Sequence, residues 1–126
     1  VVELNALKTL FDLDLVPANQ PPYQKGWLVN PHPIVKKLRL PKATGISVNE
    51  ITTHLQKVRF YKKQFNPLIE SMEGAALHYV ALQEGIPFIQ LRSTSNYIAE
   101  RNKKNWNMPA AIQSLNQSLL NLLQVL

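Results

Sequence analysis

Apolar residues recur at helical spacing near the start and in the middle of the chain. Between Leu4 and Leu15 they occupy positions 4, 7, 10, 11 and 15, which predicts one or two helical turns before Pro17. From His54 to Phe65, apolar residues at positions 55, 58, 60, 61 and 65 are interspersed with basic ones. This pattern predicts an amphipathic helix over 54–65 that stops before Pro67.

Two further helices are predicted in the second half of the chain. One begins at Met72 and ends at about Glu84, because Gly85 favours a helix stop and Pro87 prevents continuation. Pro109 opens the last helix, and its apolar stripe comprises Ile112, Leu115, Leu119, Leu122, Leu123 and Leu126. This stripe either buries against a sheet or serves as a pairing surface.

Three short apolar segments predict β-strands. Ala43 to Val48 is rich in β-branched residues, and Leu68 and Ile69 form a second strand. Ile86 to Leu91 is almost continuously apolar, as expected for a central strand that is covered on both faces. Together with a short helix over Pro33 to Leu38, these elements predict an α/β domain with three layers, α-β-α, around a mixed, twisted sheet.

Two stretches have the composition of loops. Pro17 to Pro33 contains five prolines, and its aromatic residues Tyr23 and Trp27 need to be buried. We expect these two rings to anchor the loop, although loops of this length are also often functional. Tyr97 to Asn107 is rich in Lys, Arg and Asn, and we expect it to be exposed.

The composition of the 126 residues fits a single globular domain. The absence of cysteine excludes disulfides, thiolate metal sites and a cysteine nucleophile, and it fits a reducing, cytoplasmic compartment. No apolar run approaches the length of a membrane span, so we expect no membrane partner. The start Val1-Val2-Glu3 is neither an initiator methionine nor a signal peptide, which predicts that the chain begins within a longer protein.

The net charge of +6 makes nucleic-acid binding an alternative to consider. Eight basic residues between positions 36 and 63 stand against Glu50 alone. They occupy the polar faces of predicted elements, however, and neither a helix-turn-helix nor an RNA motif with interleaved aromatic residues accompanies them. We therefore expect no nucleic-acid partner.

Metal and serine-nucleophile chemistry have little support in the sequence. His32, His54 and His78 lie in different segments, without the carboxylate spacing of a zinc or iron site. Each is expected to be a surface histidine or one with a hydrogen-bond partner. There is no Gly-x-Ser-x-Gly motif. We expect no metal and no cofactor.

The stretch from Leu68 to Ala76 carries the strongest candidate chemistry. Ser71 suits the N-cap of the helix that follows, which places Glu73 in its first turn. The positive end of the helix dipole favours an ionised carboxylate at that position. The two oxygens of a carboxylate accept two hydrogen bonds side by side, and the cis-diol of a ribose offers such paired donors.

The same residues resemble a known family. Ser71-Met72-Glu73-Gly74-Ala75-Ala76, Ile86-Pro87-Phe88 and Leu91-Arg92-Ser93-Thr94-Ser95-Asn96 resemble the second half of the purine nucleosidases of the nucleoside phosphorylase superfamily. The likeness is strongest to the futalosine hydrolase family, through Gly26 to Pro31 and Glu70 to Ala76. Methylthioadenosine/adenosylhomocysteine nucleosidases are similar, but more loosely. The resemblance extends from about Gly26 to Leu123 and is most specific from Glu70 to Tyr97.

This resemblance implies roles for three residues. Met72 packs against the ribose, Glu73 binds its hydroxyls, and Asn96 contacts the purine, with Glu73 and Asn96 as the catalytic pair. Adenine-directed members carry an aspartate at the position of Asn96. An amide can bond both the carbonyl and the ring nitrogen of a 6-oxopurine, so hypoxanthine is favoured over adenine. The alternative is that Asn96 merely ends a strand in a turn.

Arg92 interrupts the apolar run of the predicted central strand. A buried arginine needs a carboxylate partner, and Glu70 at the end of the neighbouring strand is the candidate, so we expect a structural ion pair between them. The functional alternative is that Arg92 binds phosphate for phosphorolysis.

The expected function is hydrolysis of the N-glycosidic bond of a 6-oxopurine nucleoside, with futalosine of menaquinone biosynthesis as the preferred substrate. Methylthioadenosine/adenosylhomocysteine nucleosidase and purine nucleoside phosphorylase activities are alternatives, and so is an inactive fragment or interaction module. By resemblance, the chain is the C-terminal part of a homo-oligomeric, phosphorylase-like fold whose N-terminal part, with the acid/base residue, has no counterpart here. The fragment alone is then expected to be inactive.

Overall fold

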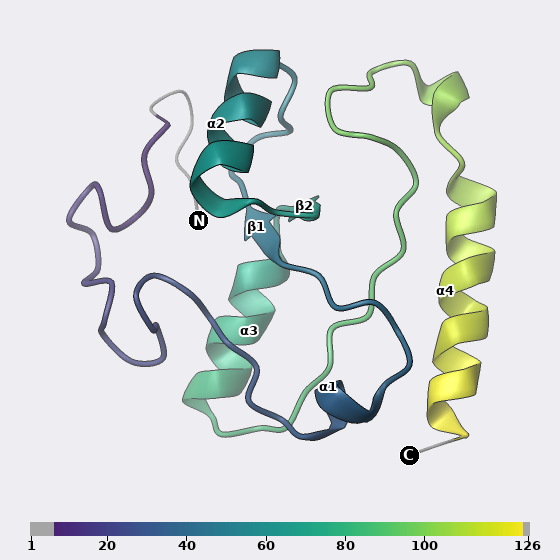
Figure 1. Ribbon diagram of the computed structural model, residues 1–126, viewed down its shortest axis with the longest axis horizontal. Helices are drawn as coiled ribbons and strands as arrows, with labels where there is room; N and C mark the ends of the chain where they lie inside the picture. Colours follow the sequence, from purple (N-terminus) through teal and green to yellow (C-terminus); the bar gives the residue numbers. More distant parts are fainter. Residues whose placement is uncertain (1–6, 125–126) are drawn as a thin grey trace.

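The computed structural model describes residues 7–124, and the elements named here are those of that range. In chain order they are α1 (Ile34–Lys37), β1 (Gly45–Ser47), α2 (Leu55–Phe65), β2 (Ile69–Ser71), α3 (Gly74–Gln83), the 3-10 helix η1 (Lys103–Asn105) and α4 (Met108–Leu123). The predicted mixture of helices and strands is confirmed (Figure 1). The sheet differs from the prediction, because its two strands in the described part of the chain are parallel rather than mixed.

The register of the sheet sets which side chains share a face. Gly45 pairs with Ile69, Ile46 with Glu70, and Ser47 with Ser71. Paired residues point to the same face, and successive residues point to opposite faces. Ile46 is packed with the buried Tyr61 of α2, so this face of the sheet carries α2. Ser47 Oγ accepts a hydrogen bond from the backbone N–H of Ala75 at 2.7 Å, so the other face carries α3.

The small core therefore lies between α2 and the sheet, with α3 beneath. Figure 1 shows α2 above β1 and β2, and α3 below them. The core consists of Ile46, Val48 and Tyr61, with Phe60 and Phe65 packed against it. Residues of α2 pack on one face of this two-stranded sheet, and the start of α3 contacts the other.

The predicted central strand over Ile86 to Leu91 is wrong. This segment has no strand assignment and joins no ladder in the described chain. The Ile86 N–H instead donates to the Ala81 carbonyl oxygen at the end of α3, at 2.9 Å, and Asn30 Nδ2 donates to the Phe88 carbonyl oxygen at 2.7 Å. Pro87 has no N–H with which to join a ladder. Apolar character alone did not decide the structure, because a strand also needs a partner for its backbone.

The helix predictions fare better. α2 starts at Leu55 and ends before Asn66, which adopts the left-handed conformation with φ 45° at the C-cap. α3 begins two residues later than predicted, and Gly85, with φ 63°, follows its end as expected. The predicted helix over Leu4 to Leu15 is not formed in residues 7–15, which make turns, and residues 4–6 lie outside the described range. The Asp12 carboxylate accepts from the Thr9 N–H and hydroxyl, a local arrangement that competes with helix.

The aromatic residues of the proline-rich loop contact rings elsewhere in the chain as predicted, but Trp27 is not buried and keeps 38% of its surface exposed. The Tyr23 ring lies 5.1 Å from that of Phe11 and 5.6 Å from that of Tyr79. The Trp27 ring lies 6.2 Å from that of Phe65, edge to face. Both rings thereby fix the loop to helices α2 and α3.

Helix α4 stands at one side of the molecule (Figure 1). Leu122 is buried and Leu115 is half-buried, but much of the apolar stripe faces outward, and Leu126 lies outside the described residues. The stripe's exposed members are Ile112, Leu119 and Leu123, and Leu120, which was not part of the predicted stripe, is exposed as well, all at 44–60% of their full surface. Within residues 7–124, no helix has the length and apolar character needed to cross a membrane.

Candidate functional site at the start of helix α3

The carboxyl end of β2 leads within two residues into α3. Ser71 Oγ accepts a hydrogen bond from the Gly74 N–H at 3.2 Å, but the N-cap is Glu73 and not Ser71 as predicted. Glu73 therefore precedes the first turn of α3 instead of lying in it. A Cβ atom at Gly74 would lie only 2.6 Å from Ser71 Oγ. This start of the helix therefore requires a residue without a side chain.

Met72 and Glu73 occupy the two positions between strand and helix. Both are exposed, Met72 at 49%. The Glu73 side chain makes no capping hydrogen bond, and within residues 7–124 it joins no ion pair. Its carboxylate is therefore free to accept bonds from another molecule at the positive end of α3.

Asn96 lies in an exposed turn. Its Oδ1 accepts from the Ser95 hydroxyl at 2.8 Å, and its Nδ2 donates to the Tyr97 carbonyl oxygen at 3.0 Å. Both ends of the amide are thus engaged by adjacent residues, as in the alternative interpretation of Asn96 as a turn former. A purine would have to replace these two bonds.

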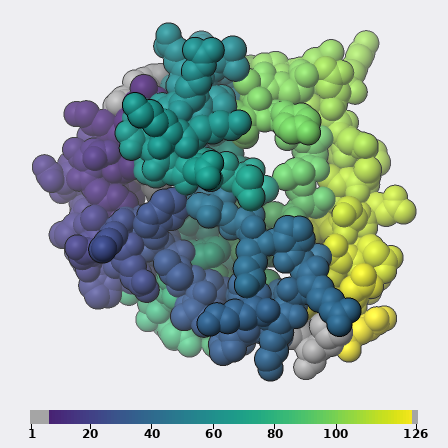
Figure 2. Space-filling model, in the orientation of Figure 1, coloured from purple at the N-terminus to yellow at the C-terminus, as the bar shows by residue number. Residues whose placement is uncertain are grey.

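A cavity of about 1310 Å³ opens between the layers. Figure 2 shows the hollow between the teal segment of α2 and β2 and the green segment that follows α3. Its polar wall near α3 includes Ser47, Gly74, His78, Gln90 and Arg92. Neither this cavity nor a smaller one beside Pro87 is lined by any of the three predicted substrate-binding residues. The structure thus leaves Met72 and Glu73 on the surface and does not join them with Asn96 in either cavity.

Several polar groups gather at the first turn of α3 that the sequence did not indicate. Gln90 Nε2 donates to the Gly74 carbonyl oxygen at 3.2 Å, and Gln90 Oε1 accepts from Arg92 Nε at 2.7 Å. An added Cβ at Gly74 would lie 3.3 Å from Arg92 Nη2. In the sequence, this contact between Gln90 and Arg92 is indicated only by their i, i+2 spacing, which places both side chains on one side of an extended segment.

The ion pair predicted between Glu70 and Arg92 is not formed. Glu70 Oε1 accepts from the Thr52 N–H at 3.1 Å, whereas Arg92 bonds Gln90. The reason lies in the strand register: Glu70 pairs with Ile46 and so points to the α2 face, while Arg92 lies beside Gly74 at the start of α3. Among the described residues, the ion pair observed is Lys57 with Glu50.

His78 is half-buried one turn into α3. Its Nδ1 lies 3.2 Å from the Gly74 carbonyl oxygen, and its ring packs edge to face on Phe88 at 4.7 Å. Burial lowers the pKa of His78 below its ordinary value. The hydrogen bond to the Gly74 carbonyl raises the pKa in part, and the positive charge of Arg92 lowers it further. The expectation of a histidine with its own hydrogen-bond partner is confirmed here. Within residues 7–124, no three His, Cys, Asp or Glu side chains gather as a metal site would need.

Comparisons of the chain with protein-family models, curated proteins and solved structures yield no match.

Proposed function

We propose that the chain is the sugar- and base-binding part of a purine nucleosidase that hydrolyses the N-glycosidic bond of a 6-oxopurine nucleoside, with futalosine as the preferred substrate. The observation that carries the proposal is the Glu73 carboxylate, exposed and without an intramolecular partner in the described residues, where a parallel strand runs into a helix. Ligands of open α/β sheets bind outside the carboxyl ends of the strands. The resemblance to nucleosidases rests on the residues around this position.

Each proposed contact uses the chemistry of one side chain. The two oxygens of Glu73 accept from the two ribose hydroxyls, and the exposed thioether of Met72 packs on the sugar. The Asn96 amide gives up its bonds to Ser95 and Tyr97 and pairs with the 6-oxo group and the adjacent ring nitrogen. Contacts that strengthen as the leaving purine gains charge and the sugar gains oxocarbenium character lower the barrier to hydrolysis.

A phosphorylase-like fold, a homo-oligomer and a cytoplasmic location belong to the same proposal. They follow from the resemblance, and the two-stranded parallel sheet with helices on both faces is compatible with such a fold. The full enzyme would supply the attacking water and its acid/base residue from strands beyond those described here.

A coupled assay for hypoxanthine tests the proposal, with futalosine and inosine as substrates in the presence and absence of phosphate. The assay uses the full-length protein that contains this chain. Release of base without phosphate supports a nucleosidase, and a strict need for phosphate would reassign the protein as a phosphorylase. Absence of turnover under every condition would contradict both enzymes.

Variants of Glu73 and Asn96 locate the site. Glu73→Gln is expected to lower kcat/KM roughly 100-fold, since it removes the charge from two hydrogen bonds that are worth about 1.5–3 kcal/mol each when charged. Glu84→Gln, at the exposed other end of α3, is the matched control and is expected to leave activity unchanged. Asn96→Asp is expected to shift preference from 6-oxopurines to 6-aminopurines. An unchanged preference would contradict the base contact.

The exposed apolar face of α4 favours a second candidate, a non-catalytic interaction module. Its outward residues Ile112, Leu119, Leu120 and Leu123 form an apolar row of the kind found at protein interfaces. This candidate predicts no base release and a change of oligomeric state when Leu119→Glu and Leu123→Glu are combined.

A further inference from the structure

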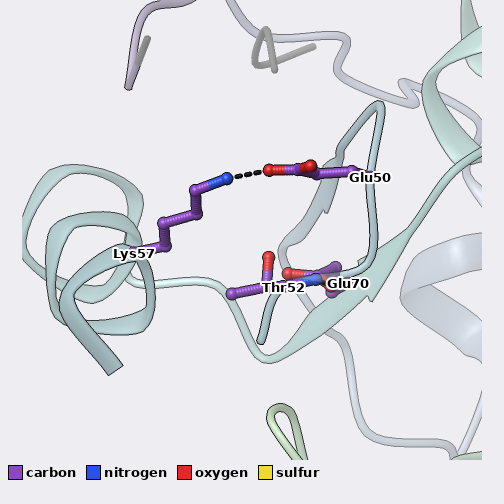
Figure 3. A network of polar contacts seen from close by, with 4 residues as sticks. All are labelled: Glu50, Thr52, Lys57 and Glu70. Carbon is purple, nitrogen blue, oxygen red and sulfur yellow. Dashed lines mark hydrogen bonds and ion pairs between the residues drawn. The ribbon is translucent and has the colours of Figure 1, made fainter. Parts of the chain in front are cut away.

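The loop after β1, residues 49–53, is held at two points by carboxylates. Figure 3 shows the contact between Lys57 and Glu50 as a dashed line, with Thr52 and Glu70 below it. Glu50 at the outer side of the loop pairs with Lys57 of α2. On the inner side, Glu70 Oε1 of β2 accepts a hydrogen bond from the Thr52 N–H at 3.1 Å. The second contact joins the loop directly to the strand that leads to Met72 and Glu73.

The two carboxylates differ in their surroundings. Glu50 is partly exposed, and surface ion pairs contribute only about 0–1 kcal/mol. Glu70 is half-buried and lies close to two buried residues, Thr52 at 1% and Tyr61 of α2 at 5% exposure. Burial raises the pKa of the Tyr61 hydroxyl, and the Thr52 side chain lowers it in part. The negative charge of Glu70 also raises the pKa of Tyr61, because the carboxylate lies near that ring.

A charged side chain at such a place is a poor choice for stability alone. Ile46, its partner in the register, is apolar and buried, and an apolar residue at position 70 would extend the same core. Glu70 is half-buried, and the polar contact of its carboxylate is the hydrogen bond from the Thr52 N–H. Glu70 fixes the position of the loop through its hydrogen bond from the Thr52 N–H, which an apolar residue could not accept.

The loop stands where the proposed ligand would bind. β1 and β2 are parallel, and Val48 N–H donates to the Ser71 carbonyl oxygen at 2.9 Å, so the loop and the Met72-Glu73 pair leave the same edge of the sheet. Thr52 points inward, whereas Asn49 and Ile51 are exposed, Ile51 at 63%. The loop thus exposes an amide and an apolar side chain, and it leaves the same edge of the sheet as Met72.

We infer that Glu70 is a positioning residue, which fixes the loop of residues 49–53 through the Thr52 N–H so that the loop forms a wall of the nucleoside site beside Met72 and Glu73. This inference rests on the proposed function. Glu70 is thereby assigned a role in substrate binding, in place of the structural ion pair with Arg92 that the sequence predicted.

Two substitutions separate positioning from mere stability. Glu70→Gln keeps an oxygen that can accept from the Thr52 N–H, and Glu70→Leu fills the same space without an acceptor. In the full-length protein, Glu70→Leu is expected to raise KM for the nucleoside at least tenfold with kcat within twofold of the wild type. Glu70→Gln is expected to stay within threefold of the wild-type KM. Glu84→Gln, which changes an exposed carboxylate at the far end of α3, is the control and is expected to leave KM within twofold.

Hydrogen exchange of the Thr52 amide reports on the loop independently of turnover. The amide is expected to exchange at least tenfold faster in Glu70→Leu than in the wild type or Glu70→Gln. An unchanged KM in a folded Glu70→Leu protein would overturn the inference, and so would a Glu70→Gln protein as impaired as Glu70→Leu.

If Glu70→Leu does not fold, Glu70→Ala takes its place, and failure of both to fold would identify Glu70 as purely structural and overturn the positioning role. Wild-type protein without nucleosidase activity but with the expected exchange pattern would overturn the proposed function while leaving the contact between Glu70 and the loop established.

Discussion

Gly74→Ala tests the geometry at the start of α3. In an ordinary exposed helix, this change stabilises by about 1 kcal/mol, because alanine has a higher helix propensity than glycine. Here Gly74 is buried, and an alanine Cβ would lie 2.6 Å from Ser71 Oγ, 3.2 Å from Gln90 Oε1 and 3.3 Å from Arg92 Nη2. The first distance is far inside van der Waals contact, so Ser71 has to move.

The expected cost follows from these contacts. Moving Ser71 Oγ removes its hydrogen bond from the Gly74 N–H, which is worth about 1 kcal/mol. Inserting a methyl group into a filled site adds about 1–3 kcal/mol. Against the gain of up to about 1 kcal/mol in propensity, we expect Gly74→Ala to lower the free energy of unfolding by about 2 kcal/mol.

A double-mutant cycle in urea isolates the clash. Ser71→Ala alone is expected to cost about 1 kcal/mol, because the Gly74 N–H loses its acceptor. In the double variant the hydroxyl that obstructs the new methyl is absent, so the combined cost is expected to fall short of the sum by at least about 1 kcal/mol, with unchanged m-values. A stabilising Gly74→Ala, or two costs that simply add, would refute the close approach described here.

Two further predictions concern α3 and α2. Because burial lowers the pKa of His78, the unfolded chain binds more protons than the folded one below about pH 6.5, so stability is expected to fall as the pH drops from 7 to 5. Urea unfolding across that range should show a flatter pH dependence for His78→Gln, and an unchanged dependence would contradict the assignment. Asn66 has φ 45° at the C-cap of α2, so Asn66→Ala is expected to cost about 1 kcal/mol and Asn66→Gly almost nothing. Equal thermal midpoints for the two variants would argue against a left-handed residue there.

The helices from α2 onwards were predictable because their signals are local, whereas the helix predicted over Leu4 to Leu15 is not formed in residues 7–15. The apolar spacing over 54–65 and the Gly85 and Pro109 signals correspond to α2, the end of α3 and the start of α4. The segment 86–91 failed because strand formation depends on a partner that no local pattern reveals.

The polar contacts were less predictable than the elements. The ribose-binding candidates Met72 and Glu73 lie exposed between β2 and α3, whereas the sequence predicted them inside the first turn of the helix, and their role stays a proposal. The partner of Glu70 could not be foreseen, since one step along a strand moves a side chain to the opposite face. The sequence allowed Asn96 to be either a turn residue or, by resemblance, a purine contact. In the structure its amide bonds the adjacent Ser95 and Tyr97, as a turn residue would.

The parallel pairing of β1 and β2 also has a kinetic consequence. Gly45 meets Ile69 only after the chain has crossed the whole of α2, so the ladder closes a long loop before it gains any hydrogen bond. Docking of Tyr61 against Ile46 and Val48 shortens that search by bringing the two strands together. Refolding should therefore slow when the Tyr61 ring is truncated, whereas cutting back the aromatic contacts of the proline-rich loop should mainly speed unfolding.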